Sequence, residues 1–173
     1  LIDQLQAFPG QIVIGPRSGS RDADFAIPAE LAPGPLQAVF PGKVVRVESL
    51  RPGLVHPGQG WEIARWREDL ETSSELELSA TDGTPACWKQ GNVRYLAAWP
   101  EPELARKVLT RAVKDARLPQ HDLPAGLRLR RAGNRTFAVN YSAQAIALPI
   151  TISGNIIMGE RCLAPAGVTV VED

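Results

Sequence analysis

The sequence predicts a mixed α/β domain followed by a small antiparallel β domain, and three features lead to this expectation. One strongly amphipathic helix lies among short strands before residue 118. A linker at residues 119–123, which begins at Pro119 and is followed by Pro124, then breaks the pattern. Beyond it, residues 124–173 contain only short apolar runs separated by turn residues, which is typical of antiparallel strands. We therefore expect one domain over residues 1–118 and another over residues 124–173.

The first third of the chain alternates between regular elements and an irregular segment. Residues 1–8 carry apolar side chains at helical spacing and end at a Pro-Gly pair, which stops a helix. Residues 11–15, QIVIG, are expected to form a strand buried on both faces, as in a parallel sheet. Residues 16–35 are rich in proline and predict an irregular excursion, with one or two helical turns at residues 34–40. KVVRVESL, residues 43–50, alternates like a strand.

Residues 60–99 are expected to form further strands. GWEIARWREDL and SELELSATDG each predict one strand. In the second of these, Leu76 and Leu78 are expected on one face, and Glu75 and Glu77 on the opposite, solvated face. The turn signals Asp-Gly and Gly-Asn then predict a hairpin formed by PACWK and NVRYLAAW.

The clearest helix covers residues 100–118, PEPELARKVLTRAVKDARL. Its apolar stripe contains Leu104, Val108 and Val113 at helical spacing. Prolines and glutamates lie at its N-terminal end and basic residues near its C-terminal end, which suits the helix dipole.

Residues 124–173 predict only β structure. LRLRR and RTFAVNY flank Gly133 and Asn134, a two-residue hairpin turn, and AIALPI, NIIMG and GVTVVE follow as short strands. So small a domain is only marginally stable alone, and we expect it to lean on the first. Two glycosylation sequons begin at Asn134 and Asn140, and we interpret both as coincidence.

The composition argues against several classes of function. Lys and Arg number 19, as do Asp and Glu, so we expect neither a nucleic acid nor a membrane as partner. No apolar run approaches the roughly 18 residues of a membrane span, and no signal peptide opens the chain, so a cytoplasmic protein is expected. Cys87 and Cys162 are expected to be buried free thiols. His56 and His121 stand alone in proline-rich loops, so neither a metal nor a cofactor is expected.

The stretch IVIGPRSGSRD, residues 12–22, has the composition of a phosphate-binding loop. Such a loop needs a helix directly behind it, because the free N–H groups of the first helical turn hold the anion. Here prolines follow the turn, and neither the P-loop ending nor the G-x-G-x-x-G pattern is present. We therefore predict no phosphate or nucleotide site at residues 17–20. We interpret the loop as a turn at the C-terminal edge of the sheet that reaches toward a partner or another domain.

Several stretches together resemble the family 42 glycoside hydrolases, the bacterial β-galactosidases. They are, in chain order, IGPRSGSRDADFAIP, LAPGPLQAVF, VVRVESLRPG, GNVRYLAAWP, LPAGLRLRRAGNRTFAVNY and LAPAGVTVVE. The resemblance implies an N-terminal catalytic barrel, which this sequence lacks. It also implies a middle α/β domain similar to the glutamine amidotransferase (flavodoxin-like) fold, which mediates trimer formation, and a small C-terminal β domain. On this basis we expect the chain to be the second half of the middle domain followed by the end domain.

The resemblance implies a non-catalytic oligomerisation and scaffold region of a β-galactosidase. The full-length protein would hydrolyse terminal β-galactosides with retention and form a homotrimer. This chain alone is expected to be inactive. Because a truncated sheet leaves an uncovered edge, we also expect the isolated chain to self-associate or to be supported by a separate N-terminal piece. The alternative is a stand-alone carbohydrate-binding module, which would present an exposed row of coplanar aromatic side chains on its β part.

No carboxylate pair in the sequence is expected to act as a glycosidase pair, and no catalytic residue is predicted. Retaining hydrolysis needs two carboxyl groups about 5 Å apart across a sugar-sized cleft. The carboxylates considered are Glu75 and Glu77 on a solvated strand face, Glu101 and Glu103 at a helix start, and Asp22 and Asp24 in the excursion.

The aromatic residues are interpreted as structural. Trp61 and Trp66 lie five residues apart on one expected strand and would therefore point to opposite faces. Trp88, Tyr95 and Trp99 are expected in the core or in packing between domains.

Overall fold

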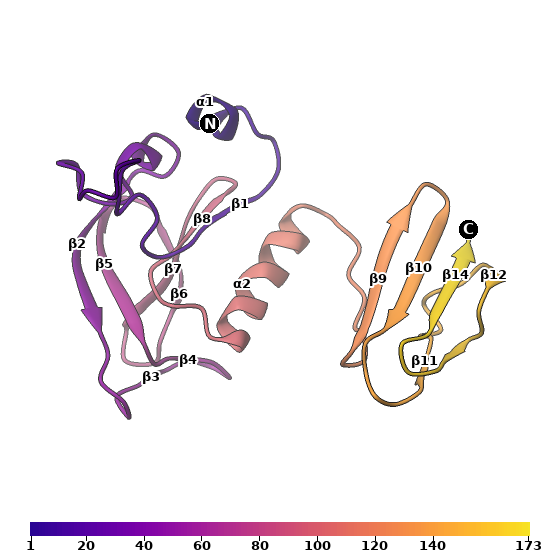
Figure 1. Ribbon diagram of the computed structural model, residues 1–173. Coiled ribbons are helices and arrows are strands. Elements are labelled where there is room, and N and C mark those ends of the chain that lie inside the picture. Colours follow the sequence, from indigo (N-terminus) through magenta and orange to yellow (C-terminus); the bar gives the residue numbers. More distant parts are fainter. The chain divides into compact units, whose positions relative to one another are not determined.

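The computed structural model describes residues 1–173 and divides into two compact units, Leu1–Pro119 and Gln120–Asp173 (Figure 1). The chain is mostly β, with few helices. No helix is long and apolar enough to cross a membrane.

The first unit contains two α-helices, one 3₁₀ helix and eight strands. In chain order these are α1 (Ile2–Gln6), β1 (Ile12–Ile14), η1 (Gly34–Ala38), β2 (Gly42–Ser49), β3 (His56–Pro57), β4 (Glu62–Ile63), β5 (Trp66–Thr72), β6 (Glu75–Ser79), β7 (Pro85–Gln90), β8 (Val93–Leu96) and α2 (Pro102–Asp115).

The main sheet of this unit has the order β1-β8-β7-β6. β1 runs parallel to β8, whereas β8, β7 and β6 pair antiparallel. The expectation of a parallel strand at QIVIG is thus met by one parallel pair, and the rest of the sheet is antiparallel. β2 and β5 form a separate antiparallel ribbon, and β3 and β4 form a short one.

The main sheet carries a core on each face. On one face, Leu104 and Val108 of α2 are fully buried in a cluster that includes Leu96 of β8. On the other face, Phe40 and Tyr95 stack with their ring centroids 5.3 Å apart. Consecutive residues of β8 therefore serve opposite cores, as the alternation of a strand requires.

The predicted hairpin before α2 and the predicted helix are confirmed, with shifted ends. The helix begins at Pro102, where a missing N–H costs nothing, and ends at Asp115. Its buried residues are Leu104, Val108 and Ala112. Val113, expected on the apolar stripe, is only partly buried, because the i, i+4, i+8 series from Leu104 faces the sheet.

The second unit is an antiparallel β structure, as predicted. Its main sheet has the order β12-β14-β10-β9, and β11 pairs with β13. The predicted turn at Gly133 joins β9 and β10. The strands are β9 (Leu127–Ala132), β10 (Arg135–Asn140), β11 (Ile146–Ala147), β12 (Asn155–Met158), β13 (Cys162–Leu163) and β14 (Val168–Glu172).

Asn140 is fully buried in this unit and holds its loops together. Its Nδ2 donates hydrogen bonds to the backbone carbonyls of Gln144, Leu163 and Ala164 at 2.7–3.1 Å. An amide engaged in this way is inaccessible to glycosylation, which agrees with reading its sequon as coincidence.

Candidate functional site

Buried Glu68 on β5 fixes the start of the segment at residues 16–33, which we call the excursion. Glu68 is only 2% exposed. Its carboxylate accepts hydrogen bonds from the Arg17 backbone N–H at 2.8 Å, from Trp66 Nε1 at 3.0 Å and from the Tyr95 hydroxyl at 2.7 Å. The Arg17 guanidinium lies over the Trp66 ring, 5.2 Å from its centroid, a cation–π contact. Burial and the Glu68 charge raise the pKa of Tyr95, so its hydroxyl stays a donor.

A closed neck gives the excursion a defined shape. Gly19 has a φ of 65°, and a Cβ at that position would lie 2.0 Å from the Pro33 carbonyl oxygen. Only glycine fits there. At the tip, Asp22 Oδ1 accepts the backbone N–H groups of the residues two and four positions later, at 3.0 and 2.9 Å. Phe25, inside this turn, has a φ of 61°, which is uncommon for a residue with a side chain.

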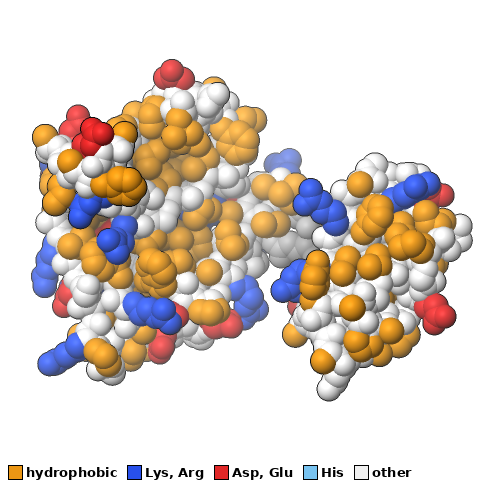
Figure 2. Space-filling model, in the orientation of Figure 1, with side chains coloured by type: hydrophobic (Ala, Val, Ile, Leu, Met, Phe, Trp, Pro, Cys, Tyr) orange, Lys and Arg blue, Asp and Glu red, His pale blue; other side chains and the backbone are white.

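The tip of the excursion presents apolar side chains to solvent. Phe25 is 84% exposed, Ile27 76% and Leu31 51%. Figure 2 shows hydrophobic side chains gathered on the surface of the first unit. A cluster of large exposed apolar side chains on an ordered loop is typical of a binding surface.

The turn at residues 17–20 is not built as an anion site. The Arg17 N–H already donates to the Glu68 carboxylate. No helix begins directly behind the turn, since η1 starts only at Gly34. The absence of phosphate and nucleotide binding stays a prediction, although the N–H groups of Arg17 and Ser20 are both occupied by hydrogen bonds within the protein.

A second surface lies along α2, and we call it the basic hollow. It has a volume of about 510 Å³. Lys107 Nζ donates to the Gln59 carbonyl at 3.3 Å, so α2 and the loop before β4 form its two walls. Four cations and one carboxylate line it. The lining residues are Gln59, Gly60, Glu103, Arg106, Lys107, Thr110, Arg111 and Lys114.

Fully buried Arg94 on β8 anchors α2 to the sheet. Its guanidinium donates to both oxygens of Glu77 on β6 at 2.9 and 2.8 Å, to Gln11 at 2.7 Å and to Asp115 at the end of α2. Asp115 also accepts from Lys89 Nζ at 2.8 Å. The Lys89 and Arg94 donors lower the pKa of Asp115 from 3.8 to about 2. The network replaces part of an apolar core between α2 and the sheet.

Comparison with known proteins identifies the first unit. The family model described as the β-galactosidase trimerisation domain matches residues 2–119. The chain belongs to this family. The resemblance noted in the sequence is thereby confirmed.

Relatives of the β-galactosidase family cover nearly all of the chain. It is 43% identical to the β-galactosidase of Thermus thermophilus, covering 99% of this chain and 28% of that protein. The solved β-galactosidase of the psychrophilic Marinomonas ef1 shares its fold with a TM-score of 0.88 at 29% identity, covering 99% of this chain and 27% of that one. For the β-galactosidase of Halorubrum lacusprofundi the TM-score is 0.77 at 26% identity. The chain thus spans less than a third of the length of these relatives.

In this chain, most of the carboxylates considered from the sequence serve structural contacts. The prediction of a solvated face at Glu77 is wrong: its side chain is only 9% exposed and pairs with Arg94. The reason is that α2 covers that face of β6, where Asp115 meets the same guanidinium. Glu101 pairs with Arg65 at 2.8 Å and Glu103 with Arg106 at 2.6 Å, while Asp22 holds its turn and Asp24 and Glu75 are exposed.

The aromatic residues divide between the core and the surface. The prediction that Trp61 and Trp66 lie on one strand is wrong, because the chain passes from the β3–β4 ribbon to the β2–β5 ribbon between them. Tyr95 is buried as expected and Trp88 is partly buried. Trp99 is 43% exposed, contrary to a core position.

The cysteine and histidine predictions are corrected in two places. Cys87 is a buried free thiol, but Cys162 is exposed, because its neighbour Leu163 faces the core and successive side chains of a strand point to opposite sides. His56 is not isolated: its Nδ1 lies 2.7 Å from Asp82 Oδ2 and 3.0 Å from Thr84 Oγ1. No group of three or more metal-ligating side chains comes together anywhere along residues 1–173.

Sequence reasoning did not identify Glu68, Arg94 or the basic hollow. A usable signal existed for Glu68, since it shares the two-residue period of Trp66 and Leu70 on β5. For Arg94 the signal was a single cation inside the apolar strand VRYL. For the hollow it was the row of basic residues along one side of the predicted helix.

Proposed function

We propose that this chain is the oligomerisation and scaffold region of a β-galactosidase that assembles as a homotrimer in the cytoplasm. The observation that carries the proposal is the match of a trimerisation-domain family to residues 2–119. The small share of each relative that the chain covers also supports a non-catalytic region. In the longer protein, a separate catalytic barrel would hydrolyse terminal β-galactosides with retention.

Within this proposal, the first unit is part of a larger flavodoxin-like α/β domain. The parallel β1–β8 pair, with α2 packed on one face, supports that assignment. β1 has no second neighbour, so one edge of the sheet is open to further strands. We keep the division into a trimerisation part at residues 1–118, a linker at residues 119–123 and a β domain at residues 124–173.

The alternative of a carbohydrate-binding module finds no support in the second unit. That unit has two aromatic residues, Phe137 and Tyr141, and Phe137 is partly buried. One exposed tyrosine, at 74%, does not form the row of rings that such a module would present.

Sedimentation equilibrium of the purified chain tests the proposal. We expect a mass near three times the 18.7 kDa of one chain, and no release of chromophore from a nitrophenyl β-galactoside. A strictly monomeric chain at all concentrations would contradict the assembly role. Turnover that is lost on replacing one of the chain's own glutamates would contradict the non-catalytic role.

A further inference from the structure

A closed trimer of identical chains places a strict requirement on its surfaces. A three-fold ring joins one patch of each copy to a different patch of the next, so every copy must carry two complementary surfaces. This inference rests on the proposed homotrimer and asks which two surfaces of the first unit meet.

The first surface is the tip of the excursion. Residues 20–31 carry three carboxylates, on Asp22, Asp24 and Glu30, and one cation, Arg21, around the exposed side chains of Phe25 and Ile27. This surface is therefore apolar at its centre and acidic around it.

The excursion is also fixed before it binds. The Glu68 hydrogen bond holds its start, and the contact of Gly19 with Pro33 closes its neck. A loop held in its binding conformation loses little entropy on association. These contacts make the tip suited to docking as a rigid body.

The second surface is the basic hollow on α2. Its four cations outnumber its one carboxylate, Glu103, which pairs with Arg106. Lys114 has no carboxylate partner among the ion pairs of the chain. The aliphatic stems of lysine and arginine accept an aromatic ring, and their charged ends accept carboxylates. The hollow thus matches the excursion in both charge and polarity.

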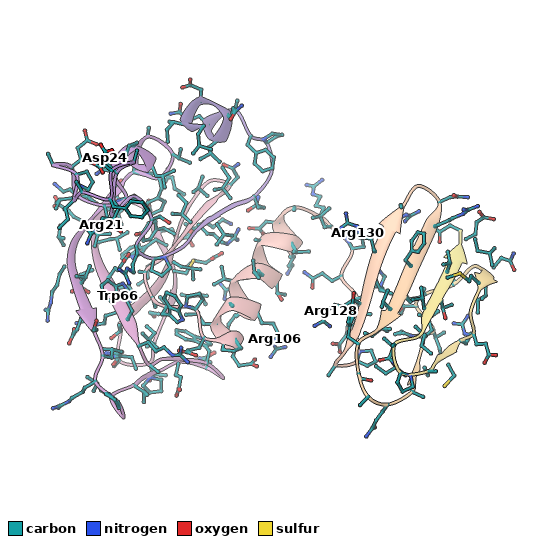
Figure 3. The ribbon with its side chains drawn as sticks, viewed as in Figure 1. Arg21, Asp24, Trp66, Arg106, Arg128 and Arg130 are labelled. Atoms are coloured by element: carbon teal, nitrogen blue, oxygen red, sulfur yellow. The ribbon has the colours of Figure 1, made fainter.

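The two surfaces cannot meet within one copy. Figure 3 shows Arg21 and Asp24 on the excursion and Arg106 at the start of α2, with the sheet strands between them. Such a separation is what a ring requires, because each copy then offers one surface in each direction around the axis.

We propose that the tip of the excursion of one copy docks in the basic hollow of the next copy. Phe25 inserts between the stems of the basic side chains, and Asp24 and Glu30 pair with Lys107, Arg111 or Lys114. Three such contacts close the ring.

Charge reversal tests this pairing by sedimentation equilibrium. D24K/E30K reverses the tip, and K107E/K114E reverses the hollow. Each double variant is expected to raise the trimer dissociation constant about tenfold or more, as loss of an interface hot spot does. The variant with all four changes is expected to trimerise again, because the charges are complementary once more. F25A is expected to weaken the trimer, whereas I150A, at a side chain 92% exposed in the second unit, is expected to leave it unchanged.

The outcomes separate this inference from the proposed function. A monomeric wild-type chain would overturn the homotrimer itself. A wild-type trimer that tolerates F25A and both double variants would overturn only the pairing of these two surfaces. A four-site variant that stays dissociated, although tryptophan fluorescence shows a native unfolding transition, would overturn it as well.

Discussion

Replacing Arg94 with methionine tests whether the buried ion network stabilises the first unit. The change removes the paired hydrogen bonds to Glu77 at 2.9 and 2.8 Å and those to Gln11 and Asp115. Glu77 would then lie almost buried, with Arg111, 3.9 Å away, as its one remaining ion-pair partner. Leaving one charge of a buried pair uncompensated costs about 3–5 kcal/mol. We expect R94M to lose about that much free energy of unfolding.

The double variant R94M/E77L separates the cost of an unpaired charge from the value of the pair. When both charges of a buried pair are replaced by apolar groups of similar size, stability is often retained. We therefore expect the double variant to recover more than half of the loss. K43M, which removes a pair between half-exposed Lys43 and exposed Glu71, should cost no more than about 1 kcal/mol.

Urea unfolding followed by tryptophan fluorescence gives these energies for the first unit alone. All four tryptophans, from Trp61 to Trp99, lie within it. Loss of less than about 1 kcal/mol in R94M, or a double variant that recovers none of the loss seen in R94M, would refute the reasoning about an uncompensated Glu77.

Three further predictions concern pH, backbone geometry and thiol reactivity. Asp115 has a pKa of about 2 in the folded chain against 3.8 ordinarily, so its carboxylate stabilises the fold above pH 3.8, and this stabilisation is lost as the pH falls toward 2. In D115N, the free energy of unfolding followed by fluorescence should therefore depend less steeply on pH in this acid range. G19A should lower the free energy of unfolding by more than about 2 kcal/mol, because it combines a left-handed φ with a clash at Pro33. G91A, with a similar φ and open space around it, should lower it by about 1 kcal/mol. Equal losses in urea unfolding would contradict the close contact between Gly19 and Pro33. With Ellman's reagent, one thiol per native chain and two per denatured chain should react, because Cys162 is exposed whereas burial raises the pKa of Cys87 to about 12. Two thiols that react rapidly in the native chain would contradict the buried position of Cys87.

Features set by neighbouring residues were predictable from the sequence. The helix over Pro102–Asp115 followed from its apolar period and its N-terminal prolines. The hairpin of β9 and β10 followed from Gly133 and Asn134 between two alternating runs. In each case the residues that decide the structure lie within one turn of helix or one hairpin.

The strand β6 shows where local alternation fails. Leu76 and Leu78 were placed on one face, yet Leu76 is 41% exposed and Leu78 is buried. The register of β6 against β7 shifts between these two residues, and such a bulge changes which side chains share a face. Nothing within β6 itself signals this shift, because it arises from pairing with β7.

The buried polar groups were missed for a related reason. A glutamate or arginine in a single sequence is taken as exposed, because burying it without a partner is costly. Two of the three hydrogen-bond partners of the Glu68 carboxylate are 51 and 27 residues away, at Arg17 and Tyr95. Those of Arg94 include Gln11, 83 residues away. The compensation that makes burial possible exists only in the folded chain.

Arg94 lies on β8, and Glu68 on β5 is held by the next residue of β8, Tyr95. Arg94 and Tyr95 are consecutive, so their side chains leave the strand on opposite faces. Arg94 holds the end of α2 through Asp115, whereas Tyr95 holds Glu68 and, through it, the start of the excursion. One strand thus fixes the basic hollow on one side of the sheet and the excursion on the other. In a ring, the angle between the two docking surfaces of a copy decides how many copies close it. Polar contacts are directional, whereas apolar contacts tolerate sliding. In the proposed ring, anchoring both surfaces by hydrogen bonds to adjacent residues of β8 would hold that angle, which gives the buried charges of Arg94 and Glu68 a role that apolar residues at the same positions could not fill.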